Sequence, residues 1–366
     1  MTAARRLFSV EGEFPMHSGG SLVKPTIAYE TWGKLDLAKS NAILIFTGLS
    51  PSAHAASCKD DPTPGWWEEI IGRGKPIDTR RYYVICINSL GSCFGSTGPA
   101  SINPSTGELY RLSFPVLSLE DVARAGFETL KHLGIERVHA IVGPSMGGMT
   151  TLAFEMQFPG LAEAIVLMSS GTRSLPFSIA LRSLQREMIR RDPAWKDGNY
   201  APDAPPLTGM RLARKLGMIT YRSAEEWRLR FGRERVGAEH TGGDAFGMNF
   251  EVESYLEHHA NKFIGQFDAN CYLYLSRASD LFDIADHGAS VEGALAKVEI
   301  KRALIIGVKT DFLFPIHQQQ ELAEGLSGNG RSVEYHELDS LQGHDSFLVD
   351  MDRYRPILAK FFEPAV

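Results

Sequence analysis

The feature that most constrains this chain is the pentapeptide Gly143–Gly147, which reads Gly-Pro-Ser-Met-Gly and lies between an apolar run and a helix-forming segment. The run Val138–Val142 predicts a buried strand, and Thr150–Gln157 predicts a helix. In this context the pattern G-x-S-x-G indicates a sharp strand-to-helix turn that presents the hydroxyl of Ser145 above a sheet. The pattern also arises by chance in a chain with 35 glycines, so its context carries the argument.

Apolar runs alternate with amphipathic segments at both ends of the chain, which is typical of an α/β fold with a mostly parallel sheet flanked by helices. Between these ends the sequence has helical spacing and no strong strand run. We therefore expect a core domain of residues 1–174 and 296–366, interrupted by a helical lid insertion at residues 175–295. The further strands are expected at Ala42–Phe46, Tyr82–Ile87, Ala164–Met168, Ala303–Val308 and Val333–Leu338, and the helices at Ile179–Ile189, Met210–Ile219, Val252–Phe263 and Tyr354–Phe362.

Composition excludes several classes of protein. The 366 residues are 43% hydrophobic and 22% charged, which is ordinary for a globular chain, and the net charge of −6 offers no basic surplus for nucleic acid. No apolar run reaches the length of a membrane span or a signal peptide, so we expect a cytoplasmic protein without a membrane partner. The four cysteines lack metal-ligand spacing, and we expect neither a metal nor a bound cofactor.

A nucleophilic serine needs a base and a group that orients the base, and on this topology they follow in the order Ser, Asp or Glu, His. Asp311 follows the predicted strand Ala303–Val308, and His344 follows Val333–Leu338. His344 would accept the proton of Ser145, and Asp311 would fix the imidazole tautomer. Taken alone, Asp311 also fits a turn or cap residue, and His344 a surface-loop histidine.

An oxyanion hole requires two backbone N–H groups near the nucleophile. We expect one from Met146, directly after Ser145, and the other from Leu49 in the loop after Ala42–Phe46, although that loop also fits a plain β-to-α turn. The glycine-rich segment Gly91–Gly98 lacks the ending of a phosphate-binding loop and predicts a structured turn near the site. The remaining candidates show no convincing partners in the sequence: Cys93, His54, His139, His258 and His259.

The residues resemble the homoserine O-acetyltransferase-like family of the α/β-hydrolase fold, which includes homoserine and serine O-acetyl- and O-succinyltransferases. The resemblance covers nearly the whole chain, the lid included. One departure is Pro144, where glycine or cysteine is commoner in the family. The matching segments are Ala28–Gly33, Gly65–Trp67, Gly74–Asp78, Gly95–Pro99, Ser101–Pro104, Phe114-Pro115, Ser145–Met149, Leu212–Arg214, Thr310–Pro315 and Gly343–Asp345.

The resemblance implies ping-pong acyl transfer from an acyl-CoA co-substrate through Ser145 to the hydroxyl of a small amino acid. It implies that Arg214 binds the substrate carboxylate and Asp345 its ammonium, although each alone also fits a solvated charge. The lid stretch Leu181–Glu187 looks more like the serine O-succinyltransferase members. Arg182 in this stretch would pair with the distal carboxylate of a succinyl group, or be a surface charge of the lid. A homodimer is a further family expectation.

The activity expected first is succinyl transfer from succinyl-CoA to L-serine, in cysteine and methionine biosynthesis. Acetyl transfer from acetyl-CoA to L-homoserine or L-serine is the alternative. A serine esterase or hydrolase would share every catalytic residue and would differ only at Arg214 and Asp345. A fold of this kind used purely for binding would need one inert member among Ser145, Asp311 and His344.

Overall fold

A central β-sheet organises the computed structural model, which describes residues 4–237, 245–328 and 330–363. Its strands are β1 (Arg6–Ser9), β4 (Thr26–Trp32), β5 (Ala42–Phe46), β8 (Tyr83–Ile87), β9 (Val138–Pro144), β10 (Ala162–Met168), β11 (Arg302–Val308) and β12 (Ser332–Leu338). In the described residues they pair in the order β1-β4-β8-β5-β9-β10-β11-β12. Pairing is parallel from β8 to β12 and antiparallel for β1 with β4 and β4 with β8. The predicted fold class is therefore confirmed.

Two hydrophobic cores lie on opposite faces of this sheet, because successive side chains of a strand point to opposite sides. On β5, Leu44 and Phe46 join one core, whereas Ile43 and Ile45 join the other. All the apolar runs expected to form strands do so. The sequence interpretation missed β1 and β4, because β4 carries Glu30 inside an apolar run; this side chain is nonetheless 1% exposed. Two small sheets complete the strands: β2 (Glu13–Pro15) with β3 (Ser21–Val23), and β6 (Ile71–Gly72) with β7 (Ile77–Asp78).

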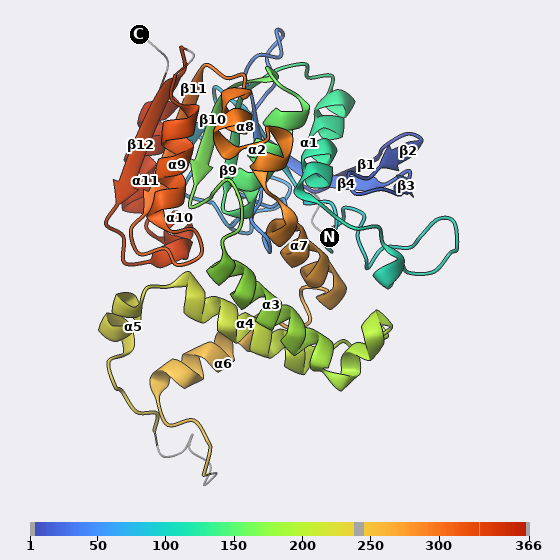
Figure 1. Cartoon of the computed structure of the whole chain (residues 1–366), viewed down its shortest axis with the longest axis vertical. Coiled ribbons are helices and arrows are strands. Elements are labelled where there is room, and N and C mark those ends of the chain that lie inside the picture. Colours follow the sequence, from blue (N-terminus) through green and yellow to red (C-terminus); the bar gives the residue numbers. More distant parts are fainter. Residues whose placement is uncertain (1–3, 238–244, 329, 364–366) are drawn as a thin grey trace.

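Helices cover both faces of the sheet (Figure 1). One core includes buried residues of α1 (Leu119–Leu133), α2 (Met146–Gln157) and α9 (Ile316–Leu326), and the other includes those of α11 (Met351–Phe361). The sequence interpretation did not include α1, although a local signal marks its start. Ser118 and Asp121 form a capping box there, and Gly134 ends the helix with φ 66°. Short helices lie at α10 (Ser346–Val349) and, as 3-10 turns, at Arg111–Ser113, Pro193–Gly198, η4 (Ile284–His287) and η5 (Gly343–Asp345).

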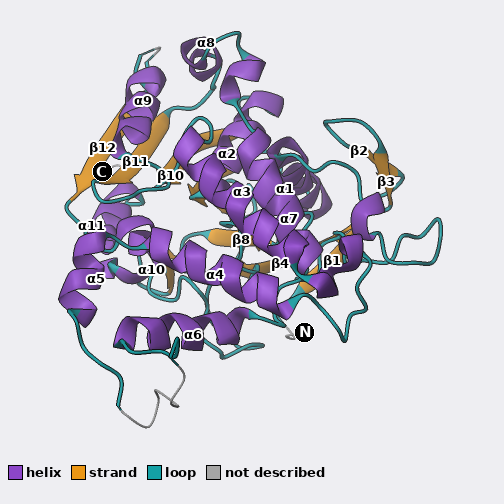
Figure 2. Ribbon diagram, turned by 60° about the horizontal axis from the view of Figure 1, so that its bottom comes forward, coloured by secondary structure: helices purple, strands orange, loops and turns teal. Residues whose placement is uncertain are grey.

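Six α-helices of the described residues lie between β10 and β11: α3 (Pro176–Arg191), α4 (Leu207–Tyr221), α5 (Ala224–Phe231), α6 (Glu251–Phe263), α7 (Ala269–Leu281) and α8 (Val291–Ala296). Helix α4 packs between α3 and α6 (Figure 2). It also contacts η5, which follows β12. Helix α8 instead packs against α9. The predicted lid, residues 175–295, thus includes α3, α4 and α6, which pack on one another, and α8, which packs against the core helix α9. None of the helices in the described ranges is long and apolar enough to cross a membrane.

Candidate active site

Ser145 occupies the turn between β9 and α2 with φ 55° and ψ −126°, a conformation that L-residues rarely adopt. Its amide donates to the Met168 carbonyl at 2.8 Å, and the Ser170 hydroxyl donates to the Ser145 carbonyl at 2.7 Å. These hydrogen bonds fix both the amide and the carbonyl of Ser145 and so hold the turn in place. Strain of this kind persists only where the surroundings enforce it, and it clusters at functional sites.

The glycines around Ser145 allow the helix to approach the sheet. A Cβ atom on Gly143 would lie 2.2 Å from the carbonyl oxygen of Gly147. A Cβ atom on Gly147 would lie 2.2 Å from the carbonyl oxygen of Phe46 on β5. Neither position can carry a side chain without moving backbone, so the spacing of the pentapeptide follows from the packing of α2 against β5 and β9.

The three residues expected to act together come from three different strand ends and lie in contact. His344 Nε2 is 2.7 Å from Ser145 Oγ, and His344 Nδ1 is 2.8 Å from Asp311 Oδ2. Asp311 Oδ1 accepts hydrogen bonds from the amides of Leu313 and Phe314 at 2.8 and 3.0 Å. The carboxylate is therefore fixed, and it favours the tautomer that leaves the Nε2 lone pair facing the serine hydroxyl.

His344 is 5% exposed, and its surroundings favour the imidazolium. Burial lowers the pKa of His344, but the charge and hydrogen bond of Asp311, and then the charge of Asp345, raise that pKa above its usual value. The Phe314 ring stacks on the imidazole with centroids 5.5 Å apart. The site can therefore hold a proton on His344 while a negative charge develops nearby, as general acid–base catalysis requires.

Ser145 and His344 line a cavity of about 150 Å³ together with the two residues expected to supply the oxyanion hole, Leu49 and Met146. The loop that contains Leu49 lies against the nucleophile, since a Cβ atom on Gly48 would lie 3.9 Å from the Cβ of Ser145, an ordinary contact distance. Met146 is the first residue of α2, where backbone N–H groups have no partner within the helix. The structure places both residues at the cavity that contains Ser145; their role as donors stays a prediction.

Arg214 and Asp345 line the same cavity. Arg214 Nε is buried and forms no hydrogen bond with any described residue, and the guanidinium lies 4.6 Å from the centroid of the Phe263 ring. Asp345 Oδ2 is 3.3 Å from the Nε of Arg222, which the sequence interpretation did not identify. Burial raises the pKa of Asp345, while Arg222, His344 and Arg214 lower it and leave it above its usual value. Tyr221, also missed, lines the same cavity, and the Arg214 guanidinium lies 5.8 Å from the centroid of its ring.

Arg182 also lines the cavity and is 8% exposed, so it is not a surface charge. Its Nε lies 2.5 Å from Asp280 Oδ1, and its Nη2 donates to the Ser174 hydroxyl at 2.6 Å. The second oxygen of Asp280 lies 2.6 Å from Nη1 of Arg186. Two arginines thus share one aspartate, which leaves one net positive charge beside the cavity.

Other expectations have mixed outcomes. The segment Gly91–Gly98 is a turn, as expected, but it is not among the described residues that line the Ser145 cavity. The expectation that His54 lacks a partner is wrong, because its Nδ1 is 2.8 Å from Glu30 Oε2. His139 lies 3.6 Å from Glu163, which the sequence did not reveal because the two residues lie on different strands. Over the described residues no cluster of three or more His, Cys, Asp or Glu side chains could hold a metal ion.

Comparison with known proteins first defines the class. A family model described as alpha/beta hydrolase fold matches residues 41–350. This range contains the Ser145 turn, Asp311 and His344, so the sheet and the site together are those of an enzyme built on the α/β-hydrolase fold.

Individual relatives then narrow the class. A protein of Litchfieldella anticariensis named serine O-succinyltransferase is 56% identical over 99% of this chain and 99% of its own length. A protein of Streptomyces lavendulae named L-serine/homoserine O-acetyltransferase is 54% identical over 98% of this chain and 97% of its own. The crystal structure of homoserine O-acetyltransferase from Bacillus anthracis superposes with a TM-score of 0.91 at 30% identity, covering 99% of this chain and 98% of that one. The chain belongs to the homoserine O-acetyltransferase-like family of the α/β-hydrolase fold, as the resemblance predicted.

Proposed function

We propose that this enzyme transfers a succinyl group from succinyl-CoA to the side-chain hydroxyl of L-serine, in cysteine and methionine biosynthesis. The observation that carries the proposal is the content of one cavity: a serine hydrogen-bonded to a histidine, with a cation and an anion beside them. A free amino acid is a zwitterion, and Arg214 and Asp345 offer it one charge of each sign. A plain esterase has no need of that pair. The name of the 56% identical relative supports the same reaction.

The first half-reaction acylates Ser145. His344 Nε2 accepts the hydroxyl proton while Oγ attacks the thioester carbonyl, and the amides of Leu49 and Met146 stabilise the oxyanion. Collapse of the tetrahedral intermediate breaks the carbon–sulfur bond, and His344 returns its proton to the departing CoA thiolate. Asp311 stabilises the imidazolium throughout, consistent with the raised pKa of His344.

The second half-reaction transfers the acyl group to the amino acid. Arg214 binds the α-carboxylate and Asp345 the ammonium, which places the serine hydroxyl near the acyl carbon. His344 removes the hydroxyl proton, the new ester bond forms, and Ser145 leaves with that proton. Arg214 suits this role because its buried Nε forms no hydrogen bond within the described residues, and a buried charged donor without a partner is unfavourable until an anion binds.

The net positive charge of the Arg182, Arg186 and Asp280 group supports succinyl over acetyl as the transferred group. We expect Arg182→Ala to lower kcat/KM for succinyl-CoA about 10- to 100-fold and to change that for acetyl-CoA much less, as loss of a charged hydrogen bond predicts. Arg186→Ala is the comparison variant, because it removes the same net charge beside Asp280 but no side chain that lines the cavity, and so separates a direct contact of Arg182 from the loss of charge. Equal losses with both donors would remove this role from Arg182.

The decisive experiment crosses succinyl-CoA and acetyl-CoA with L-serine and L-homoserine and identifies the products by mass spectrometry. O-Succinylserine as the dominant product supports the proposal. O-Acetylhomoserine or O-acetylserine would favour the second candidate, which the name of the Streptomyces lavendulae relative supports. Free acid without any O-acylated amino acid would indicate a hydrolase instead.

We further propose a cytoplasmic homodimer that associates through the lid. Large apolar side chains are exposed on α3 and α4, including Leu184 at 46% and Leu212 at 42%. Exposed apolar patches of this kind are typical of interfaces. Light scattering after size-exclusion chromatography measures the mass in solution, and a monomer would contradict this part of the proposal.

A further inference from the structure

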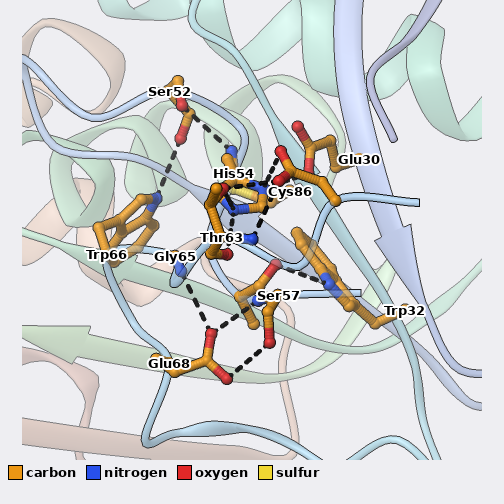
Figure 3. Close-up of polar contacts among 12 residues, drawn as sticks. Glu30, Trp32, Ser52, His54, Ser57, Thr63, Gly65, Trp66, Glu68 and Cys86 are labelled. Carbon is orange, nitrogen blue, oxygen red and sulfur yellow. Dashed lines mark hydrogen bonds and ion pairs between the residues drawn. The ribbon is translucent and has the colours of Figure 1, made fainter. Parts of the chain in front are cut away.

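A second group of charged side chains lies outside the Ser145 cavity, where β4 meets the loop after β5 (Figure 3). His54 Nδ1 is 2.8 Å from Glu30 Oε2, and His54 Nε2 is 2.9 Å from the Thr63 carbonyl oxygen. Asp61 Oδ2 lies 3.7 Å from Nδ1. These four residues are called the His54 clamp below. Glu30 is 1% exposed, and the clamp is therefore an ion pair largely removed from water.

The partners of the imidazole fix its charge. A carbonyl oxygen only accepts hydrogen bonds, so Nε2 must carry a hydrogen toward Thr63. A carboxylate oxygen also accepts, so the geometry favours a hydrogen on Nδ1 as well, which makes His54 an imidazolium. Burial lowers the pKa of His54, but the hydrogen bonds to Glu30 and Thr63 and the charges of Glu30 and Asp61 raise that pKa above its usual value.

The clamp is connected to the catalytic cavity through a loop without secondary structure. Trp66 donates from its backbone amide to the His54 carbonyl at 3.3 Å and from its ring to the Ser52 carbonyl at 3.0 Å. Trp66 lines the Ser145 cavity, as do the loop residues that precede the clamp: Gly48, Leu49, Ser50 and Pro51. His54, where the clamp holds this loop, thus lies five positions after Leu49, the expected oxyanion donor.

Two further titratable groups near the clamp, Glu68 and Cys86, keep their state near neutral pH. Glu68 accepts hydrogen bonds from the amides of Ser57 and Gly65. Burial raises the pKa of Glu68, but hydrogen bonds from Ser57, Lys75 and Gly65 lower it to about 2, so this carboxylate stays ionised. Burial, and then the charge of Glu30, raises the pKa of the Cys86 thiol on β8, which stays neutral. Of these three groups, His54 is the one whose charge changes as the solution becomes alkaline.

We propose that His54 is a positioning residue whose imidazolium, held between Glu30 and the Thr63 carbonyl, fixes the loop 48–54 and so aims the Leu49 amide at the oxyanion formed on Ser145. The proposal rests on the proposed function only in requiring acylation of Ser145. Loss of the proton removes the donor at Nδ1 or Nε2 and so breaks one of the two hydrogen bonds that hold the imidazole. Turnover is then expected to fall as the pH rises through the pKa of His54.

The test compares His54→Gln and Glu30→Gln with the control His287→Gln. The control removes a similar pair, since His287 Nε2 is 2.9 Å from Glu120 Oε1, but the two residues lie on η4 and α1 and not on the loop 48–54. Loss of one complete oxyanion donor lowers kcat about 10²- to 10³-fold, so we expect a displaced donor in His54→Gln to lower kcat about 10- to 100-fold. KM is expected to stay within about threefold, and the alkaline fall in kcat to disappear.

Glu30→Gln keeps the shape of the clamp and removes the carboxylate charge, so the alkaline fall in kcat is expected at lower pH. If His54→Gln does not fold, Glu30→Gln still tests the proposal. The melting temperature of each variant separates a loss of stability from a loss of loop positioning. A His54→Gln enzyme with the kcat and pH profile of His287→Gln would overturn the proposal. A Glu30→Gln enzyme whose alkaline limb stays at the wild-type pH would overturn it too.

The burst of p-nitrophenolate from p-nitrophenyl acetate separates this proposal from the proposed function. Acylation by this ester requires Ser145 and the oxyanion hole but neither CoA nor an amino acid. A wild-type enzyme that shows the burst and transfers no acyl group from CoA would refute the proposed function. The same variants would still test the clamp through the size and pH dependence of the burst rate.

Discussion

Replacing Gly147 by alanine is expected to impair catalysis far more than it impairs folding. The new Cβ atom would lie 2.2 Å from the carbonyl oxygen of Phe46 and 2.9 Å from its carbonyl carbon, both backbone atoms of β5. Contacts of a Cβ atom under 3.0 Å essentially do not occur, so the start of α2 must withdraw by at least 0.8 Å. That movement carries Ser145 and the Met146 amide with it.

A misplacement of about 1 Å at a reacting group can lower a rate about 10²-fold, which equals about 2.7 kcal/mol of transition-state stabilisation. Alanine in a helix is favoured over glycine by up to about 1 kcal/mol, and this partly offsets the steric strain in the folded state. We therefore expect kcat/KM to fall about 10²-fold while the protein remains folded at 25 °C.

The assay is the rate of labelling of Ser145 by a fluorophosphonate, measured together with kcat/KM for acyl transfer and with the melting temperature. Gly325→Ala on α9 is the matched control, because the atom that its Cβ meets most closely is a terminal methyl of Leu295, which can move. Labelling and turnover of Gly147→Ala within threefold of the wild type would refute the argument that this glycine sets the position of the nucleophile.

Two further predictions concern the charges of the site. Activity should fall as the pH drops through the pKa of His344, because the base must be neutral to accept a proton and its pKa is raised above the usual value. Asp311→Asn removes the carboxylate that raises this pKa, so the acid limb of the pH profile should move to lower pH. The same variant should lower kcat by about 10⁴-fold. An acid limb unchanged in that variant would contradict the role of Asp311. Arg214→Lys should lower kcat/KM for L-serine about 10- to 100-fold, since an ammonium cannot form the bidentate contact, and leave the rate of Ser145 acylation within twofold. A slowed acylation step, measured by intact-protein mass spectrometry, would place Arg214 elsewhere in the mechanism.

Local pattern was sufficient to predict the parts of the fold that depend on neighbouring residues. The buried strands β5, β9, β10 and β11 each contain an apolar run, because a parallel strand that is covered on both faces needs apolar side chains on both. The Ser145 turn was predictable for a similar reason, since Gly143 and Gly147 mark the points where helix and sheet backbones meet. Strand β4 was missed because Glu30 interrupts its pattern, and only the clamp explains why a carboxylate is buried there.

The sequence by itself determined the order of the elements, the nucleophile turn and the residue types of the site. Which side chains meet was decided by the tertiary structure, because the partners are far apart in the chain: His344 is 33 residues from Asp311 and 199 from Ser145. The pairs His54 with Glu30 and Arg182 with Asp280 are likewise 24 and 98 residues apart. Charges at such separations leave no periodic trace in a sequence, since each contact depends on how strands and lid helices pack in space.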